Sequence, residues 1–529
     1  MSTERIAIVG IGLRYPDASS TEDLWENVLA GRRAFRRLPD QRMNQADYYS
    51  PDQDAPDRFY SKKAAVLRDF EFDRLKYKVA GSTYRSTDLT HWLALDVAAT
   101  ALADAGFPDA EGLPRQSTGV VFGNSLTGEF ARANLMRLRW PYVRRTLAAA
   151  LAAKGWDDDE TAAFLRDLEP VYKAPFPPID EDTLAGGLAN TIAGRVCNYF
   201  DLGGGGYTVD GACSSSLISV ATAAKALTDG DLDVCLAGGV DLSIDPFEVI
   251  GFAKTGALAS SEMKIYDADS NGFWPGEGSG VVVLMREEDA IARGARIYAS
   301  ITGWGMSSDG KGGITRPEAA GHRLAISRAY TRAGYGVETV GYFEGHGTGT
   351  ALGDATELEA IGSARRNSDP QAPPAAISSL KGNIGHTKAA AGVGGLIKAT
   401  LAVYHQVIPP ATGHYDPHPK LTGDDAALYV PNAPELWPAD RPVRAGVSAM
   451  GFGGINTHIA LEQAPGTERR TTLPAEVGTL NSGRQDAELL LFDADDVATL
   501  RGNVAATLEV VPKLSFAELT DLAGELAGK

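Results

Sequence analysis

Short apolar runs alternate along most of the chain with longer stretches in which apolar residues recur every three or four positions. The short runs predict strands buried on both faces, and the periodic stretches predict helices. The predicted strands are Ile6–Val9, Thr118–Phe122, Val234–Gly238, Gly280–Leu284, Ala299–Gly303, Val340–Phe343, Ala376–Ser378 and Ala445–Ala449. The predicted helices include Trp92–Ala105, Ser215–Leu227, Gly321–Ala333 and Ala355–Ala364. This alternation is typical of an α/β fold.

The pattern changes near the end of the chain. Residues 464–485 are rich in Pro, Gly, Thr, Arg and Ser and have no periodicity, which predicts a flexible linker. Beyond it, Leu489–Phe492 is a strand candidate, and apolar residues then recur at helical spacing from Val497 to Leu508. Two aspartates directly before Val497 favour a helix N-terminus there.

The composition is that of a globular protein and excludes some classes of function. The 529 residues are 44% hydrophobic and 22% charged. The net charge of −18 argues against binding to nucleic acid, because phosphates would be repelled. We find no signal-peptide pattern and no membrane-spanning apolar run, so we expect a cytoplasmic protein that does not bind membranes. The three cysteines lack metal-ligand spacing, so we expect no metal site.

One cysteine lies in a setting that suits a nucleophile. In residues 208–216 (TVDGACSSS), a β-prone run leads into a turn of small residues that carries Cys213, and a predicted helix follows. Unsatisfied N–H groups and the positive end of the helix dipole favour the thiolate over the thiol. A buried cysteine that packs as a small hydrophobe is the alternative interpretation.

Two histidines lie in glycine-flanked turns that follow strand-like runs. His346 belongs to residues 344–350 (EGHGTGT), and His386 belongs to residues 381–392 (KGNIGHTKAAAG). Each histidine alone is more typical of a structural residue than of a catalytic one. Together with Cys213, they form the set expected of a cysteine nucleophile with distant histidine partners.

These motifs, with residues 451–458 (GFGGINTH), resemble the β-ketoacyl synthase domain of type I polyketide synthases. The resemblance runs from Ile6 to about Ala464, and it is closest to the iterative synthases that build the polyene precursor of enediyne antibiotics. Residues 85–95, 203–206 and 271–278 carry this narrower match. The resemblance implies a thiolase fold, with two similar halves stacked as five αβαβα layers in a homodimer. The Gly-x-Gly starts at residues 6–12 and 301–305 correspond faintly between the halves.

The resemblance also implies the catalytic roles. Cys213 takes the growing acyl chain as a thioester, and the backbone N–H groups of Cys213 and Phe452 form the oxyanion hole. His346 and His386 donate N–H bonds to the malonyl thioester as CO₂ leaves. Lys381 supports the histidines electrostatically, and Phe452 gates access to the acyl pocket.

Further residues are assigned by the same resemblance. Thr348 and Thr350 bind the phosphopantetheine arm that an acyl carrier protein presents, so no cofactor is bound directly. Gly451 and Gly453 let the gate loop swing. Glu357 is expected either to brace this network or to be an ordinary glutamate on a helix surface. The chain departs from the common family pattern at Gly205–Gly206, Gly211, Gly345 and Lys388, and none of these departures removes a catalytic group.

Two basic clusters stand out from the acidic background. One comprises Arg32, Arg33, Arg36 and Arg37, and the other comprises Arg137, Arg139, Arg144 and Arg145 around Trp140. Each is either a solvated helix face or a docking patch for an acidic carrier protein, where complementary charge would speed association.

The predicted domain organisation follows the change of pattern. Residues 1–463 form the ketosynthase domain, residues 464–485 the linker, and residues 486–529 the start of the subdomain that joins a ketosynthase to an acyltransferase. We therefore expect the chain to be the N-terminal piece of a longer synthase, with an acyltransferase and further domains as partners.

Other interpretations of the same residues differ in the chemistry they require. A non-catalytic chain-length-factor homologue would lack the nucleophile Cys213. A thiolase would need a second active-site cysteine, and neither Cys197 nor Cys235 is flanked by glycines. A cysteine protease leaves Lys381 without a role. The ketosynthase of a modular polyketide synthase, or a fatty-acid β-ketoacyl synthase, is the serious alternative to the iterative synthase.

Overall fold

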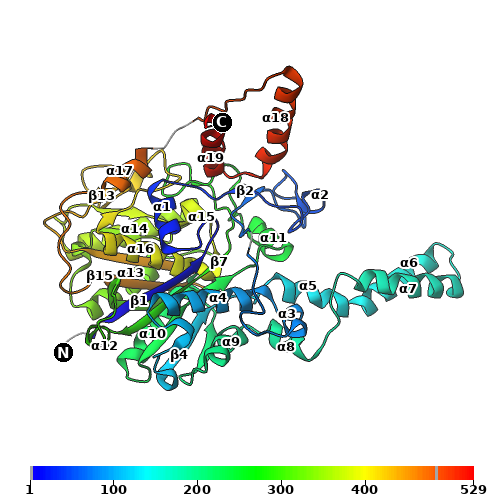
Figure 1. The fold of residues 1–529 in the computed structure, drawn as a ribbon, viewed down its shortest axis with the longest axis horizontal. Helices are drawn as coiled ribbons and strands as arrows, with labels where there is room; N and C mark the ends of the chain where they lie inside the picture. The colour runs from blue at the N-terminus through cyan, green and yellow to red at the C-terminus, as the bar shows by residue number, and fades with distance from the viewer. Residues whose placement is uncertain (1–3, 69, 312, 483–486, 529) are drawn as a thin grey trace.

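The fold is centred on one large mixed sheet, seen in a computed structural model that describes residues 4–68, 70–311, 313–482 and 487–528 (Figure 1). Its strand order is β12-β10-β9-β14-β15-β8-β1-β7-β6-β4-β5. The strands are β1 (Ile6–Arg14), β2 (Arg36–Arg37), β3 (Lys63–Ala64), β4 (Thr118–Gly123), β5 (Gly206–Val209), β6 (Val234–Asp241), β7 (Gly278–Arg286), β8 (Ala299–Ser308), β9 (Tyr342–Glu344), β10 (Ala375–Ser378), β11 (Val407–Ile408), β12 (Leu428–Tyr429), β13 (Glu435–Leu436), β14 (Arg444–Gly451) and β15 (Ile455–Glu462). All the predicted strands before residue 464 are confirmed.

Helices cover the sheet, and the predicted helices before residue 464 are confirmed as α4, α10, α13 and α14. The helices are α1 (Thr21–Leu29), α2 (Gln45–Tyr48), α3 (Gly81–Arg85), α4 (Leu89–Asp104), α5 (Glu129–Leu138), α6 (Trp140–Ala153), α7 (Asp158–Lys173), α8 (Glu181–Gly187), α9 (Asn190–Phe200), α10 (Ser215–Thr228), α11 (Pro246–Lys254), α12 (Glu287–Ala292), α13 (Ala319–Ala333), α14 (Ala351–Ser368), α15 (Lys381–Ile384), α16 (Ala391–His405), α17 (Ala475–Ser482), α18 (Val497–Val510) and α19 (Phe516–Ala527).

The sheet is built from two halves that repeat the same strand pattern. In the first half, β1 pairs antiparallel with β7 and β7 with β6, whereas β6 pairs parallel with β4 and β4 with β5. In the second half, β8, β15, β14, β9 and β10 follow the same sequence of pairings. The halves meet where β1 pairs with β8, with Ile6 opposite Ile301. The prediction of two similar halves is therefore confirmed.

The Gly-x-Gly motifs of β1 and β8 allow a helix to pack closely on the strand in both halves. A Cβ on Gly10 or Gly12 would lie 2.5 or 2.2 Å from a backbone oxygen of α4. A Cβ on Gly303 or Gly305 would lie 2.2 or 2.0 Å from a backbone oxygen of α13. Each glycine pair thus lets an outer helix pack directly on the strand.

Layers of helices lie on both faces of each half. Helix α4 packs on β1 and β7, and α13 packs on β8 and β15. Helices α10 and α16 pack against each other and against strands of both halves, so they form the central layer. Every residue of α16 from Ala391 to Val403 is buried. This is the αβαβα stacking that the resemblance implies.

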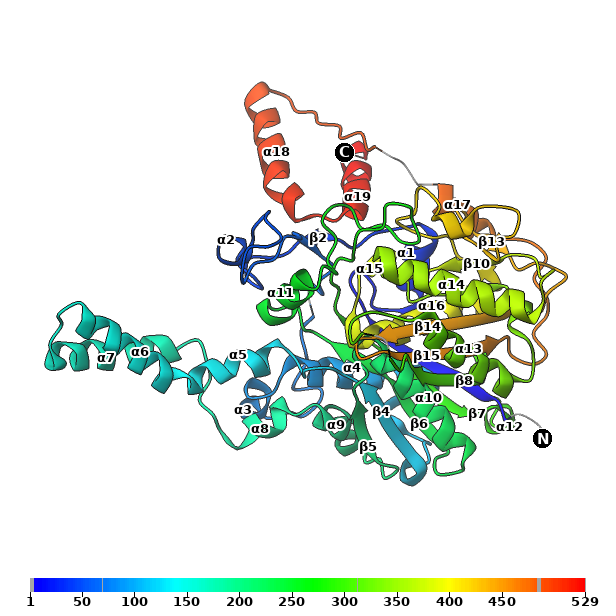
Figure 2. The same cartoon turned by 180° about the vertical axis from the view of Figure 1, so that it is seen from behind.

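Helices α5 to α7 project from the body as an arm, which both views show plainly (Figures 1 and 2). The second basic cluster lies on this arm, where Arg144 and Arg145 are exposed and form no ion pair within the described ranges. Large apolar side chains on the same helices are also exposed: Leu135, Met136, Leu138, Tyr142, Phe164 and Val171.

The C-terminal segment differs in part from its prediction. Within the predicted linker, residues 475–482 form α17, whose Val477 is buried against the core, so this part is a packed helix. The strand predicted at Leu489–Phe492 is wrong: these residues pair with no strand among those described, and an isolated extended segment has no partner for its backbone. The helix predicted from Val497 is confirmed as α18, with Asp496 as its N-cap.

Three arginines of the first basic cluster form ion pairs with acidic residues of the same chain. Arg32 forms an ion pair with Asp521 at 2.6 Å, and Arg36 forms one with Glu518 at 2.8 Å, so two members bind α19. Arg33 pairs with Glu262 at 2.6 Å. A free docking patch is therefore excluded for these three arginines. None of the described helices combines the length and apolar character that a bilayer crossing requires.

Candidate active site

Cys213 lies at a strained turn between β5 and α10. The turn is a short 3₁₀ helix, Ala212–Ser214, that runs directly into α10. Ala212 has φ +51°, in the left-handed region that residues other than glycine seldom adopt. Asp210 accepts the Ala212 N–H at 2.9 Å, and the Ser214 hydroxyl donates to Thr457 at 2.8 Å. These bonds hold the cysteine at the N-terminus of α10, where the sequence places it.

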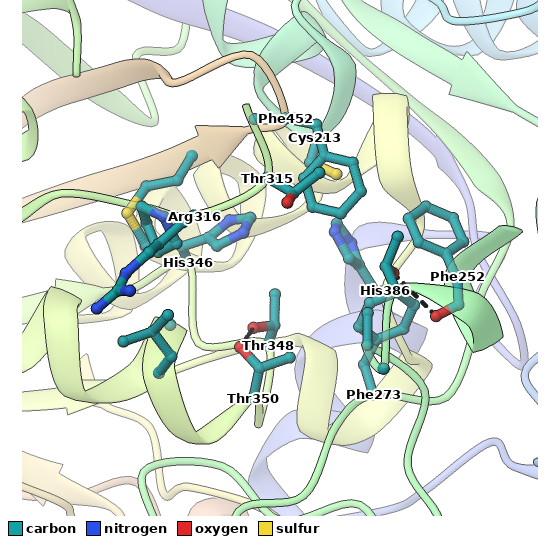
Figure 3. Close-up of a pocket in the computed structure, with 18 of the residues that line it drawn as sticks. Cys213, Phe252, Phe273, Thr315, Arg316, His346, Thr348, Thr350, His386 and Phe452 are labelled. Carbon is teal, nitrogen blue, oxygen red and sulfur yellow. Dashed lines mark hydrogen bonds between the residues drawn. The ribbon is translucent and has the colours of Figure 1, made fainter. Parts of the chain in front are cut away.

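A cavity of about 370 Å³ brings Cys213, His346 and His386 together (Figure 3). Thr348, Thr350, Gly451 and Phe452 line the same cavity. Seven of the nine predicted site residues thus share one pocket. Lys381 and Gly453 are not among its lining residues.

The two histidine rings lie close together and nearly perpendicular. Their centroids are 5.5 Å apart, with an interplanar angle of 87°. Burial, with a smaller effect of the Lys381 ammonium, holds the pKa of both His346 and His386 well below the usual value, so both rings are neutral at neutral pH. The Nδ1 atom of His386 accepts the Lys388 N–H at 3.2 Å, which leaves the proton of that neutral ring on Nε2.

Lys381 lies behind His346 and holds its backbone. Its Nζ donates to the His346 carbonyl at 2.5 Å, and its side chain is buried. Burial lowers the pKa of Lys381, while the nearby carboxylates Glu344 and Glu357 act in the opposite direction. The lysine therefore acts on the histidine turn from outside the cavity.

Glu357 braces the same turn and is fully buried, so the interpretation as a helix-surface glutamate is wrong. Its two carboxylate oxygens accept the His346 N–H at 2.7 Å and the Gly347 N–H at 2.8 Å. The Tyr266 hydroxyl donates to it at 2.8 Å. That hydroxyl lies 1.8 Å from where a Cβ on Gly345 would be, which explains why this position is a glycine.

Burial changes the predicted ionisation of the nucleophile. Removal from water raises the pKa of Cys213 to about 12, and the Lys381 ammonium offsets this only in part. The thiolate that we expected from the helix N-terminus is therefore not the resting form, because the cost of burying an anion outweighs the dipole. The thiol must therefore lose its proton as it reacts.

The glycine-rich loop after β14 approaches the cysteine turn closely. A Cβ on Gly451 would lie 2.1 Å from the Gly211 carbonyl oxygen, so only glycine fits there. Phe452 is 39% exposed, and its ring centroid lies 5.9 Å from that of Phe252. Gly453 has φ +93° and is held by an N–H bond to Ile314 at 2.7 Å.

The polar end of the cavity carries two threonines from the turn that leads into α14, and Thr350 is the N-cap of that helix. The hydroxyls of Thr348 and Thr350 lie 3.0 Å apart, and Figure 3 shows both on the same side of the cavity, across from Cys213. Hydroxyls in this position can bond amide and carbonyl groups of an extended thioester arm.

Comparison with known proteins agrees with this geometry. The family description "Beta-ketoacyl synthase, N-terminal domain" matches residues 3–290, and "Beta-ketoacyl synthase, C-terminal domain" matches residues 298–415. The chain belongs to the β-ketoacyl synthase family. It is therefore an acyl-transferring enzyme of the class that forms carbon–carbon bonds, and members of this family act on acyl groups carried by phosphopantetheine.

Curated relatives of this synthase are much longer proteins. The chain is 35% identical over 467 residues to one component of the phenolphthiocerol/phthiocerol polyketide synthase of Mycobacterium tuberculosis, which covers 87% of the chain and 23% of that protein. It is 32% identical over 514 residues to one component of the polyunsaturated fatty acid synthase of a Thraustochytrium species, covering 95% of the chain and 18% of that protein. For 5-methyl-1-naphthoate synthase of Streptomyces sahachiroi the identity is 32%, covering 98% and 27%. The chain thus spans about a quarter or less of these relatives.

Solved ketosynthases share the fold. The ketosynthase from module 6 of the bacillaene synthase of Bacillus subtilis superposes with a TM-score of 0.72 at 29% identity, covering 96% of this chain and 77% of that one. The PfaC ketosynthase–chain length factor gives a TM-score of 0.76 at 29% identity, covering 89% and 49%. These matches confirm the thiolase fold that the motifs imply.

The cavity is also lined by residues that the sequence analysis did not assign to the site. Phe252, Phe273, Thr315 and Arg316 line the pocket, and Phe273 packs edge-on against the His386 ring at 4.9 Å. Phe273 lies within residues 271–278, a motif of the family resemblance, so the sequence did offer a reason to expect it near the site. Thr315 and Arg316 lie in a loop without any pattern, so nothing in the sequence marks them.

Proposed function

We propose that the chain is the ketosynthase domain of an iterative type I polyketide synthase. It would condense an acyl chain bound to Cys213 with malonyl-carrier protein, repeatedly, to build a polyene that is an enediyne precursor. The cavity that joins Cys213, His346 and His386 carries the chemical part of this proposal. The iterative and enediyne parts rest on the resemblance of residues 85–95, 203–206 and 271–278.

In the first step, the Cys213 sulfur would attack the carbonyl carbon of an acyl thioester. The tetrahedral oxyanion would accept hydrogen bonds from the backbone N–H groups of Cys213 and Phe452. The pantetheine sulfur would then leave as a thiol, taking up the proton that the Cys213 thiol releases. Loss of one such oxyanion donor typically slows a reaction by ~10²–10³-fold.

In the second step, malonyl thioester would lose CO₂ and form an enolate. N–H bonds from His346 and His386 to its carbonyl oxygen would stabilise that charge. Neutral imidazoles suit this task, and their lowered pKa values keep them neutral. Departure of CO₂ supplies the carbanion, so no carboxylate base is needed. The enolate carbon would attack the acyl group on Cys213 and release its sulfur.

Other residues would guide the substrate. Thr348 and Thr350 would bind the phosphopantetheine arm, and Lys381 would hold the His346 turn through the bond to its carbonyl. Phe452 would gate the acyl pocket, with Gly451 and Gly453 as the flexible ends of its loop. The exposure of Phe452 supports a mobile gate.

The proposed partners are an acyl carrier protein, a second copy of the chain, and downstream domains that include an acyltransferase. An acidic carrier would dock on the arm at Arg144 and Arg145, which are exposed and basic.

Residues 1–463 would be the ketosynthase domain, 464–485 a linker that contains α17, and 486–529 the start of the segment leading to the acyltransferase. The edge strand β5, with Tyr207 45% exposed, is available to pair with a second copy.

A modular polyketide ketosynthase or a fatty-acid β-ketoacyl synthase is the second candidate. It is favoured by the similarity to a module 6 ketosynthase and to a component of a polyunsaturated fatty acid synthase. A non-catalytic chain-length-factor role is disfavoured because Cys213 is present and lies in the pocket.

The test is condensation with purified components. The chain is incubated with an acyl-pantetheine thioester and malonyl-carrier protein, and the carrier is analysed by mass spectrometry. We expect a β-ketoacyl product that is absent for H346A/H386A, although this variant still acylates Cys213. Product from the double variant would contradict the assignment of the histidines. Reconstitution with the remaining domains, read as product length, would separate iterative from modular use.

A further inference from the structure

Lys388 lies two residues after His386 and acts directly on the turn that carries it. Its backbone N–H donates to His386 Nδ1 at 3.2 Å. To do so, Lys388 adopts φ +50°, in the left-handed region that side-chain-bearing residues seldom occupy. A strained residue of this kind persists only where its surroundings hold it in place.

The Lys388 side chain supplies that restraint through a buried ion pair. Its Nζ lies 3.0 Å from an Asp241 carboxylate oxygen and donates to the Gly276 carbonyl at 2.7 Å. The other Asp241 oxygen accepts the Ala389 N–H at 3.2 Å. Lys388 is 3% exposed and Asp241 1% exposed. The Asp241 carboxylate therefore holds the turn at two points, the Lys388 ammonium and the Ala389 N–H.

Residues 274–276, the segment before β7 whose Gly276 carbonyl accepts the lysine, also fix the histidine backbone. The His386 N–H donates to the Trp274 carbonyl at 2.9 Å, and the Gly276 N–H donates to the His386 carbonyl at 2.9 Å. Phe273 packs edge-on against the imidazole. The ring is thus held from one side by this segment, and from the other by the Lys388 peptide.

We propose that the Lys388–Asp241 ion pair is a positioning device for His386. It holds the peptide whose N–H keeps Nδ1 unprotonated, so that the ring presents Nε2–H to the cavity as a donor. The pair acts through His386 and does not touch the reacting atoms, and the proposal rests on the role of His386 proposed above.

Charge supports the same role. The groups that face His386 are Lys381, His346 and Lys388, and all three oppose a positive charge on its ring. Around Lys388, burial disfavours the ammonium, but Asp241, Glu248 and Glu277 raise its pKa above the usual value. The lysine therefore stays charged at neutral pH. It helps to keep His386 neutral while Asp241 holds it in place.

Two variants separate positioning from plain stability. K388M removes the cation, and D241N removes the anion while keeping the cation near His386. Each breaks the same buried pair. For both, we expect the rate of CO₂ release from a malonyl thioester to fall at least tenfold relative to the rate of Cys213 acylation. K388M should also move the low-pH limb of CO₂ release to higher pH, because loss of the cation raises the pKa of His386, whereas D241N should not.

A second ion pair provides a control. Arg444 and Glu462 lie 2.8 Å apart, with side chains 18% and 17% exposed, and no hydrogen bond joins either to a histidine ring in the described part of the chain. R444M should lower thermal stability without changing the ratio of CO₂ release to acylation. The H386A variant tests the underlying role: wild-type CO₂ release by H386A would overturn the proposed function of that histidine.

The outcomes distinguish the two proposals. If H386A is inactive in CO₂ release but K388M and D241N keep the wild-type ratio, the positioning proposal is wrong and the proposed function stands. An equal loss of both reactions in K388M, D241N and R444M would assign the Lys388–Asp241 pair to stability alone. A selective loss in K388M and D241N, with the upward pH shift in K388M only, would support the proposal.

Discussion

Replacement of Glu357 by glutamine tests how the His346 turn is held. The carboxylate is fully buried, and each of its oxygens accepts a backbone N–H, from His346 at 2.7 Å and from Gly347 at 2.8 Å. Glutamine keeps the shape but has one acceptor oxygen. Its NH₂ group must face one of the two N–H donors, which then loses its partner.

The magnitude follows from these bonds. A hydrogen bond to a charged group contributes roughly 1.5–3 kcal/mol, and a buried donor left unpaired costs roughly 1–3 kcal/mol. The two effects overlap, so we expect E357Q to lower the free energy of unfolding by about 2–4 kcal/mol. Removal of the Tyr266 hydroxyl by Y266F loses one bond to the same carboxylate but leaves both N–H bonds intact and no donor unpaired, so it should cost roughly 1.5–3 kcal/mol and leave CO₂ release unchanged.

The assay is urea denaturation followed by tryptophan fluorescence, with the two variants compared side by side. CO₂ release from a malonyl thioester should also fall about tenfold or more in E357Q, because a displacement of His346 by a fraction of an ångström misaligns its N–H. A stability within ~0.5 kcal/mol of the wild type, together with full CO₂ release, would refute the reasoning that Glu357 holds the turn.

The other predictions concern the thiol, the gate loop and the arm. Alkylation of Cys213 by iodoacetamide should keep rising with pH beyond pH 9 because burial raises the pKa of Cys213 to about 12, and a plateau near pH 8 would count against a buried thiol. G451A should slow acylation about 10²-fold, because its Cβ would lie 2.1 Å from the Gly211 carbonyl oxygen and displace the loop. Unchanged acylation kinetics would show that the loop moves aside without disturbing the site. R144E/R145E should raise KM for carrier-bound substrate only, and an equal effect on a small thioester would argue against docking on the arm.

The sequence predicted the central fold well because its signals are local. Buried strands such as β6 and β7 are continuous apolar runs, and α10 begins directly after the cysteine turn. The spacing of apolar residues and the small residues of the turn were therefore enough to predict where these elements lie. The motifs around Cys213, His346 and His386 can likewise be recognised from the residues next to each of them.

What the sequence missed depends on contacts between distant segments. For Glu357 the sequence left two interpretations open, a brace and a helix-surface glutamate, and its burial and the bond from Tyr266, 91 positions earlier, decide for the brace. Lys388 and Asp241 are 147 positions apart, and neither residue alone marks a buried pair. The docking of Arg36 on Glu518 and the unpaired state of residues 489–492 depend in the same way on which partners are present.

The expected ionisation of Cys213 failed for a related reason. A helix N-terminus can be inferred from sequence, and it favours a thiolate. The degree of burial around the sulfur is set by the whole fold, and Cys213 is only 7% exposed. Desolvation then dominates, so the thiol is the resting form.

The most direct measurement is the site of covalent labelling by an acyl-pantetheine thioester. After incubation and proteolysis, mass spectrometry should find the acyl group on the peptide that contains Cys213, and C213A should show none. Label on another residue, or equal labelling of C213A, would contradict the claim that this sulfur accepts the growing chain.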